Sequence, residues 1–212
     1  MQDFRRGEQE AAGKLAAYAR SLDTGRALPD WSRASADSEH LGAKLADAVL
    51  QRAVNYERFV RPRVKRLVLR YPDAHNLTGL QRAVAEVGAS KMLDVASGEK
   101  PLTFESLVQA LALERVESVA DLREFLSDRW RANRLLNVPG VGPKTIAFLK
   151  LLVGLDAVAL DKHLLAALKS AGIPACDPSE AESLFRLAAQ ELGITMSQLD
   201  ALLWRHGSGT TS

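Results

Sequence analysis

The hydrophobic residues of this chain recur at the spacing of an α-helix over most of its length, and this restricts the fold more than any other feature. The alternation with a period of two residues that a half-buried strand requires is nearly absent. Alanine and leucine are abundant, and both favour helices. We therefore predict an all-α, two-lobed multi-helix bundle. The expected helical segments lie near residues 7–20, 39–54, 62–71, 76–87, 88–97, 103–113, 118–136, 143–154, 161–171, 178–192 and 196–205.

Several of these segments begin with a recognisable helix-capping sequence. The residues Asp177–Glu180 combine an N-cap carboxylate, a proline in the first turn and a glutamate three residues after the cap. Thr195 and Gln198 repeat the spacing of a capping box. Ser118 precedes Val119-Ala120-Asp121 and is expected to cap the segment that follows it. These signals support the assignment of separate short helices.

Composition narrows the class of protein. The chain has 212 residues, which suits one large domain or one domain with two lobes. The single cysteine, Cys176, excludes an intramolecular disulfide and a four-cysteine iron–sulfur cluster. The N-terminus lacks the apolar region of a signal peptide, and no apolar stretch approaches the roughly 20 residues of a membrane span. A cytoplasmic protein without membrane contact is therefore expected.

The densest group of helix breakers is Pro139-Gly140-Val141-Gly142-Pro143, which joins one apolar helix end directly to the next helix. Glycines at this point allow backbone torsions that side chains forbid, and they allow a ligand to approach the main chain. The new helix presents unpaired N–H groups and the positive end of its dipole, which together suit a phosphate. The alternative is a tight turn in which the glycines serve geometry alone.

The stretch Leu135–Leu149 resembles the helix-hairpin-helix motif, whose pattern is close to L-P-G-V-G-x-K-T-A. Val138 stands in place of the leading leucine, and Ile146 in place of the usual alanine. The downstream segment Val158–Leu164 resembles the V-D-x-H segment of the helix-hairpin-helix DNA glycosylases, which include endonuclease III-like and 8-oxoguanine-glycosylase-like members. Upstream, Val87–Lys91 resembles the helix start that precedes the hairpin in those enzymes. The resemblance covers roughly residues 41–172. It implies that the hairpin lies at the cleft of the two-lobed fold.

This resemblance implies a catalytic pair, because Lys144 and Asp161 stand at the positions of the family's catalytic lysine and aspartate. A neutral amine attacks C1′ of deoxyribose to form a Schiff base, which in that family permits strand cleavage by β-elimination. A carboxylate stabilises the positive charge that develops on the sugar. Lys144 lies in the first turn of a helix, where the dipole disfavours added positive charge, and partial burial would act in the same direction.

Simpler roles exist for both residues. Lys144 alternatively serves as a point charge on a phosphate, and Asp161 as the N-cap of the helix 162–171. The histidines show no spacing typical of a metal site. The family resemblance implies instead a possible Na⁺ or K⁺ ion on the backbone carbonyls of Leu136, Val138 and Val141, with no other cofactor required.

Positive charge is concentrated in two stretches although the net charge is only +2. Seven basic residues and one acid lie between Arg52 and Arg70, and five basic residues and one acid lie between Asp128 and Lys150. Either stretch can grip phosphates or form an ordinary solvated helix face. The candidate contacts to the DNA backbone are Gly140, Gly142, Lys144, Thr145, Arg61, Arg63 and Arg134.

An enzyme that extracts a base from duplex DNA needs a side chain to fill the gap. In the resembling enzymes this residue follows an early helix, which corresponds here to Asn55 or Tyr56. Tyr56 alternatively belongs to the core, and Trp130 and Phe148 are expected there as well.

The expected organisation has five parts. An N-terminal helix and linker (1–40) packs on the C-terminal lobe, and residues 41–136 form a barrel-like helical lobe. Residues 137–172 hold the hairpin and the catalytic aspartate, residues 173–206 form C-terminal helices, and 207–212 form a disordered tail.

Three classes of function follow. The first is a DNA repair glycosylase that excises a damaged base from double-stranded DNA or acts at an abasic site, with associated lyase activity. Such an enzyme is expected to be a nucleoid-associated monomer. The second is a non-catalytic DNA-binding protein with the same hairpin. The third is an all-α interaction domain. The sequence leaves the identity of the base open.

Overall fold

The computed structural model describes residues 2–22, 39–51, 54–174 and 177–207. All secondary structure in these ranges is helical, which confirms the all-α prediction. The described residues do not include 23–38, which belong to the expected N-terminal linker. They also do not include Arg52, Cys176 or the tail beyond Gly207. The chain divides into two compact units, one of residues 35–155 and one of residues 1–34 together with 156–212.

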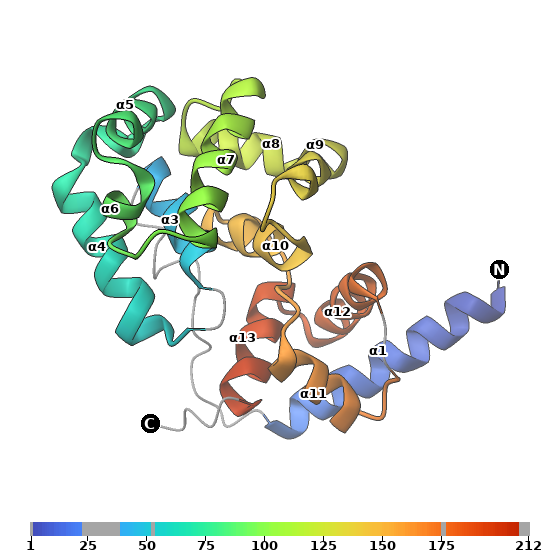
Figure 1. Cartoon of the computed structure of the whole chain (residues 1–212). Coiled ribbons are helices and arrows are strands. Elements are labelled where there is room, and N and C mark those ends of the chain that lie inside the picture. The colour runs from blue at the N-terminus through green and yellow to red at the C-terminus, as the bar shows by residue number, and fades with distance from the viewer. Residues whose placement is uncertain (1, 23–38, 52–53, 175–176, 208–212) are drawn as a thin grey trace. The chain divides into compact units, whose positions relative to one another are not determined.

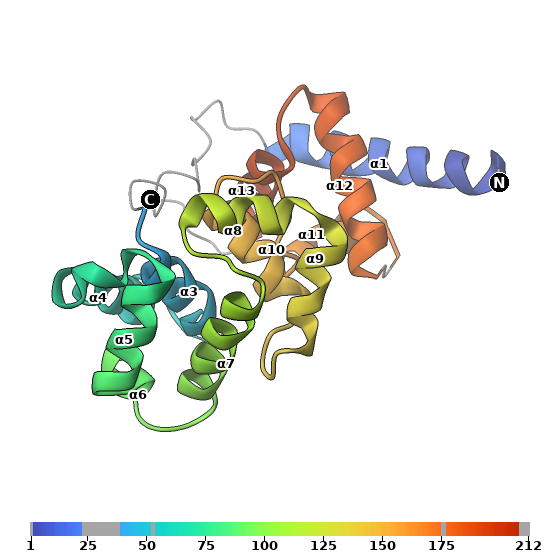
Figure 2. The ribbon, with the colours of Figure 1, turned by 90° about the horizontal axis from the view of Figure 1, so that it is seen from above.

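The unit of residues 35–155 is built around one buried helix, α3 (Leu41–Leu50), all ten of whose residues are buried. Helices α4, α7 and α10 pack against it (Figures 1 and 2). The other elements, in order, are η1 (Tyr56–Val60), α4 (Arg61–Arg70), η2 (Pro72–His75), α5 (Leu77–Val87), α6 (Ala89–Leu93), α7 (Glu99–Leu113), α8 (Val119–Ser127), α9 (Arg129–Asn133), η3 (Arg134–Asn137) and α10 (Pro143–Leu152).

The second unit consists of α1 (Gln2–Leu22), α11 (Lys162–Ser170), α12 (Pro178–Leu192) and α13 (Met196–Gly207). Helix α1 lies along α12, and α11 packs on α13. The core of this unit contains Leu15, Phe185 and Leu199, each with no exposed surface. The N-terminal helix therefore buries its apolar face against C-terminal helices far away in the sequence.

The helix starts predicted from capping sequences are present. Ser118 and Asp121 form a reciprocal capping box at the start of α8. The Thr195 amide donates to the Gln198 side chain, and the Gln198 amide donates to Thr195 Oγ1. The same exchange joins Asp177 and Glu180 before α12. Local sequence therefore determines these boundaries.

The single helix expected over 118–136 is wrong. Asp128 has extended backbone torsions, and its carboxylate accepts hydrogen bonds from the amides of Trp130 and Arg131, so it ends α8 and begins α9. Trp130, which was expected in the core, lies in α9 after this break and is 85% exposed. Helix α6 is likewise shorter than the expected 88–97, because Asp94 adopts a left-handed conformation directly after Leu93.

None of the described helices has the length and apolar character that a membrane span requires.

Candidate active site

The turn Val138–Gly142, called the glycine turn below, carries η3 directly into α10. The amide of Val141 donates to the carbonyl of Val138 at 3.0 Å, which closes the turn. Gly140 has a φ of +82°, a conformation that favours glycine, and it lies against the buried side chain of Thr103 on α7. Val141 is buried in the core of this unit. The turn is thus fixed both by its own hydrogen bonding and by packing.

Helix α10 begins in a way that suits an anion. Its N-cap is Gly142, which has no side chain to cover the first amides, and Pro143 at the first position has no N–H. The first intrahelical hydrogen bond runs from the Ile146 amide to the Gly142 carbonyl. The amides of Lys144 and Thr145 belong to the first turn, where no intrahelical acceptor exists. Their N–H dipoles and the helix dipole favour negative charge at this end.

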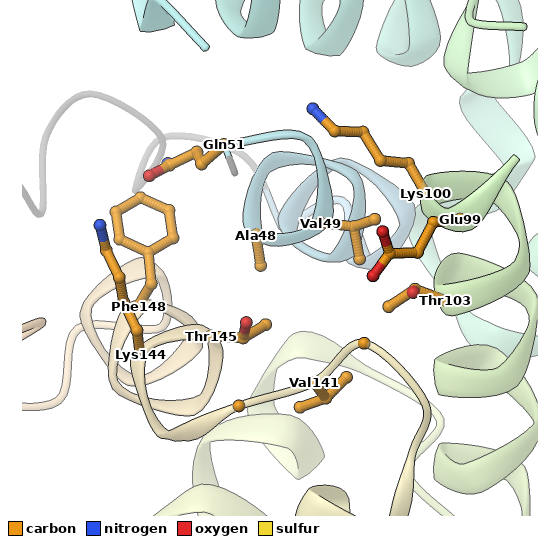
Figure 3. Close-up of a pocket in the computed structure, with 12 residues that line it drawn as sticks. Ala48, Val49, Gln51, Glu99, Lys100, Thr103, Val141, Lys144, Thr145 and Phe148 are labelled. Carbon is orange, nitrogen blue, oxygen red and sulfur yellow. The ribbon is translucent and has the colours of Figure 1, made fainter. Parts of the chain in front are cut away.

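A cavity of about 710 Å³ lies beside the glycine turn, within the unit of residues 35–155. Figure 3 shows that α10 and α7 form opposite sides and that α3 lies between them. The lining residues are Ala48, Val49 and Gln51 from α3 and its C-cap, Glu99, Lys100 and Thr103 from α7, and Gly140, Val141, Gly142, Lys144, Thr145 and Phe148 from the turn and α10. Its size falls within the range of about 300–1,000 Å³ typical of small-molecule sites.

The cavity combines a mostly apolar lining with a few polar groups of distinct chemistry. Lys144 is exposed and Phe148 is half-buried, and both come from α10. The contribution of burial to the reactivity of Lys144 stays a prediction. Lys100 also lines the cavity, and its Nζ donates to the Leu50 carbonyl at 2.7 Å and lies 4.9 Å from the centre of the Phe59 ring.

Asp161, the second candidate catalytic residue, belongs to the other unit. Its carboxylate accepts hydrogen bonds from the amides of His163 at 2.8 Å and Leu164 at 3.1 Å, so it is the N-cap of α11. The ring of His163 meets that of Trp204 edge-on at 6.2 Å. The capping role is thus present, whereas the pairing of Asp161 with Lys144 stays a prediction.

The sequence analysis missed a buried polar cluster on α3. The Asp47 carboxylate is 1% exposed and accepts hydrogen bonds from Gln51 Nε2 at 2.8 Å and from Tyr56 Oη at 3.1 Å. Burial raises the pKa of Asp47 to about 6, although the two hydrogen bonds and the charge of Lys44 oppose this shift. Burial and the adjacent Asp47 raise the pKa of Tyr56. The available signal was Lys44 and Asp47 within an otherwise apolar helix.

The raised pKa of Asp47 predicts a specific dependence of stability on pH. The folded protein protonates Asp47 near pH 6, whereas the unfolded chain does so near pH 4. Between pH 7 and pH 5 the folded state therefore binds the extra proton, and this contribution to the free energy of unfolding rises by about 1 kcal/mol as the pH falls. Urea unfolding at both pH values should show this increment in the wild type relative to Asp47→Asn.

Comparing the wild type with Asp47→Asn also removes the contribution of His40 to the pH dependence of stability. Burial lowers the pKa of His40 in the folded state. Its contribution to the free energy of unfolding is therefore complete above the pKa that histidine has in the unfolded chain, and it decreases as the pH falls. Both proteins contain His40, and its contribution cancels in the difference. An identical change between pH 7 and pH 5 in wild type and Asp47→Asn would show that Asp47 does not titrate in this range.

The candidate arginines have partners inside their own unit. Arg61 pairs with Glu57 at 2.7 Å, and Arg134 pairs with Glu114 at 3.0 Å. The guanidinium of Arg63 donates to the carbonyls of Phe59 and Asp94 and lies 3.9 Å from the centre of the Phe59 ring. The basic stretch on α4 is therefore partly engaged in holding η1 and α6, and its contact with phosphates stays a prediction.

The two candidate wedge residues have different surroundings. Asn55 is exposed, and its side-chain oxygen accepts a hydrogen bond from the Arg58 amide at the start of η1. Tyr56 is half-buried, with its hydroxyl on Asp47. The hydrogen bond to Asp47 favours a positioning role for Tyr56 over insertion into a base stack.

No metal-ligand cluster of three or more His, Cys, Asp or Glu side chains occurs among the described residues. The proposed monovalent cation would instead use backbone carbonyls, of which that of Val138 already accepts the Val141 amide within the glycine turn. The carbonyls of Leu136 and Val141 belong to the same short segment. The cation site stays a prediction.

Comparison of the chain with protein-family models, with curated proteins and with solved structures finds no match.

Proposed function

We propose that this protein is a DNA glycosylase that removes a damaged base from double-stranded DNA and cleaves the strand through a Schiff base on Lys144. One observation carries the proposal: Lys144 lines a cavity of about 710 Å³ immediately after a turn whose geometry suits a phosphate. An amine, an anion site and a space for a small ring are thereby collected within one unit. The resemblance of Leu135–Leu149 to the helix-hairpin-helix motif supports the same assignment.

The glycine turn would hold the DNA backbone. Gly140 and Gly142 have no side chains that keep a phosphate away, and the first amides of α10, including that of Thr145, are suited to donate to it. Such contacts bind DNA of any sequence, because they reach only phosphate oxygens. They would fix the position of the deoxyribose relative to Lys144.

The extruded nucleotide would then direct its base into the cavity, where Phe148 offers an aromatic face. The neutral Nζ of Lys144 attacks C1′, and the base leaves with the electron pair of the N-glycosidic bond and takes up a proton. Loss of the amine proton and opening of the sugar produce the Schiff base. Removal of a C2′ proton then expels the 3′ phosphate. In this proposal Asp161 stabilises the positive charge on the sugar.

Borohydride trapping tests this function directly. The protein would be mixed with labelled duplexes that carry an abasic site, uracil, 5,6-dihydrouracil, 8-oxoguanine or hypoxanthine, with an undamaged duplex as control. Reduction converts a Schiff base into a stable protein–DNA adduct, which we expect for the abasic duplex and for at least one base. Release of a base without an adduct would indicate a water nucleophile. Neither adduct nor base release would overturn the proposal.

A non-catalytic DNA-binding protein is the second candidate function, and the exposure of Lys144 favours it specifically. An exposed ammonium group at a helix N-terminus suits a point contact with a phosphate, whereas nucleophilic attack needs the neutral amine. In that case DNA binding would be strongly salt-dependent, and no covalent adduct would form.

A further inference from the structure

Gln51 lies at the C-cap of α3, where it lines the cavity, and its amide is held in one orientation. Its Nε2 donates to Asp47 Oδ1 at 2.8 Å. An ionised carboxylate accepts hydrogen bonds but cannot donate them, so the nitrogen and not the oxygen of the amide must face Asp47. The Oε1 atom of Gln51 therefore does not face Asp47 and remains as the acceptor that this cavity-lining side chain can offer a ligand.

Asp47 is itself held in place. Its second oxygen accepts the hydroxyl of Tyr56 at 3.1 Å, and its side chain is buried on a helix with no exposed residue. The carboxylate thus has a partner on each oxygen, and it cannot rotate away from Gln51 without breaking one of them. A buried network in which each member fixes the next orients a polar group more firmly than a single surface hydrogen bond.

The surroundings of Gln51 indicate what it can contact. Ala48 and Val49 form the apolar part of the cavity on α3, and Phe148 offers an aromatic ring from α10 (Figure 3). Apolar and aromatic walls favour a flat heterocycle, and they give it no hydrogen bonds. Gln51 is therefore placed where it can read the polar edge of such a ring.

We propose that Gln51 is a specificity-determining residue that accepts a hydrogen bond from an N–H group of the extruded base, and that Asp47 and Tyr56 are its positioning residues. This inference rests on the proposed glycosylase function. It assigns base selection to a side chain on α3, separate from the amine on α10 that attacks the sugar.

The abasic duplex provides an internal reference, because it contains no base for Gln51 to contact. For each base that the wild type releases, kcat/KM is divided by kcat/KM for strand cleavage at the abasic site. In Gln51→Leu this ratio should fall by about tenfold, the size expected when a base N–H loses a hydrogen-bond acceptor in its binding site. Cleavage of the abasic duplex should change by less than about twofold.

The positioning role of Asp47 is tested by a double-mutant cycle. Asp47→Asn should lower the same ratio, because an asparagine side chain can donate to the Gln51 oxygen and so allow the amide to turn. In the Gln51→Leu background the same substitution should leave the ratio unchanged. Tyr56→Phe should lower the ratio less than Asp47→Asn does, since it removes one hydrogen bond and keeps the carboxylate.

The outcomes separate this inference from the proposed function. Absence of both an adduct and base release with the wild type would overturn the function itself. Normal cleavage of the abasic duplex with an unchanged ratio in Gln51→Leu would overturn only the role of Gln51. Equal losses on both kinds of duplex would show a structural role instead. A further fall on adding Asp47→Asn to Gln51→Leu would overturn the positioning role of Asp47.

Discussion

Lys144→Gln is expected to abolish the borohydride adduct and to slow strand cleavage at an abasic site by on the order of a thousandfold or more, because it removes the proposed nucleophile. Glutamine keeps a side chain of similar length and a polar end, but its amide cannot form a Schiff base. Lys144 is exposed, so the substitution should leave the free energy of unfolding nearly unchanged. The measurement is the yield of adduct and the single-turnover cleavage rate.

Lys150→Gln is the matched control for this prediction. Lys150 lies in the last turn of the same helix and does not line the cavity, so its replacement should leave adduct formation intact. Binding of Lys144→Gln to the abasic duplex should remain within a few-fold of the wild type, since the turn amides are unchanged. An adduct of undiminished yield in Lys144→Gln would exclude Lys144 as the nucleophile.

Gly140→Ala is expected to destabilise the protein by roughly 3 kcal/mol, the largest effect on stability that we predict for a single methyl group. The φ of Gly140 is +82°, where an alanine side chain is strained. Its new Cβ would also overlap with Oγ1 of the buried Thr103 on α7. Either the Thr103 side chain or the glycine turn must therefore shift, and urea unfolding should report the loss.

Gly142→Ala separates this effect from the general cost of replacing glycine in the turn. Gly142 has a φ of −114°, and nothing lies near the position of an added Cβ. Its replacement should change the free energy of unfolding by less than about 0.5 kcal/mol. Combining Gly140→Ala with Thr103→Ala should recover part of the loss by removing the overlap. Equal destabilisation by Gly140→Ala and Gly142→Ala would contradict this account of the turn.

Much of the local structure can be predicted from sequence, because it depends on residues a few positions apart. The capping boxes at Ser118, Asp177 and Thr195 are present where the sequence predicts them. The glycine turn lies where Pro139–Pro143 interrupts the helical pattern. Asp128 shows the limit of this reasoning, since a residue that is acceptable within a helix instead caps a new one. Trp130, in the first turn of this new helix, lies on the surface.

The sequence predicts only the part of the candidate site that depends on residues close together in the chain. Lys144 and the glycine turn lie on one continuous segment, which a motif can describe. Gln51, Glu99 and Phe148 come from three separate helices, and nothing in their local sequence indicates that they line one cavity. Asp47 differs from these three residues, since a charged residue in an otherwise apolar helix indicates from the sequence alone that it has a buried polar partner.

The sequence by itself determined the all-helical class, the principal helix starts and the position of the glycine turn, because these depend on periodicity and on hydrogen bonds between near neighbours. Only the tertiary structure decided that Thr103 packs against Gly140, that Asp47 orients Gln51, and that these groups surround a cavity next to Lys144. Such contacts depend on how helices distant in the chain pack, and packing is set by the fit of whole surfaces rather than by any local pattern.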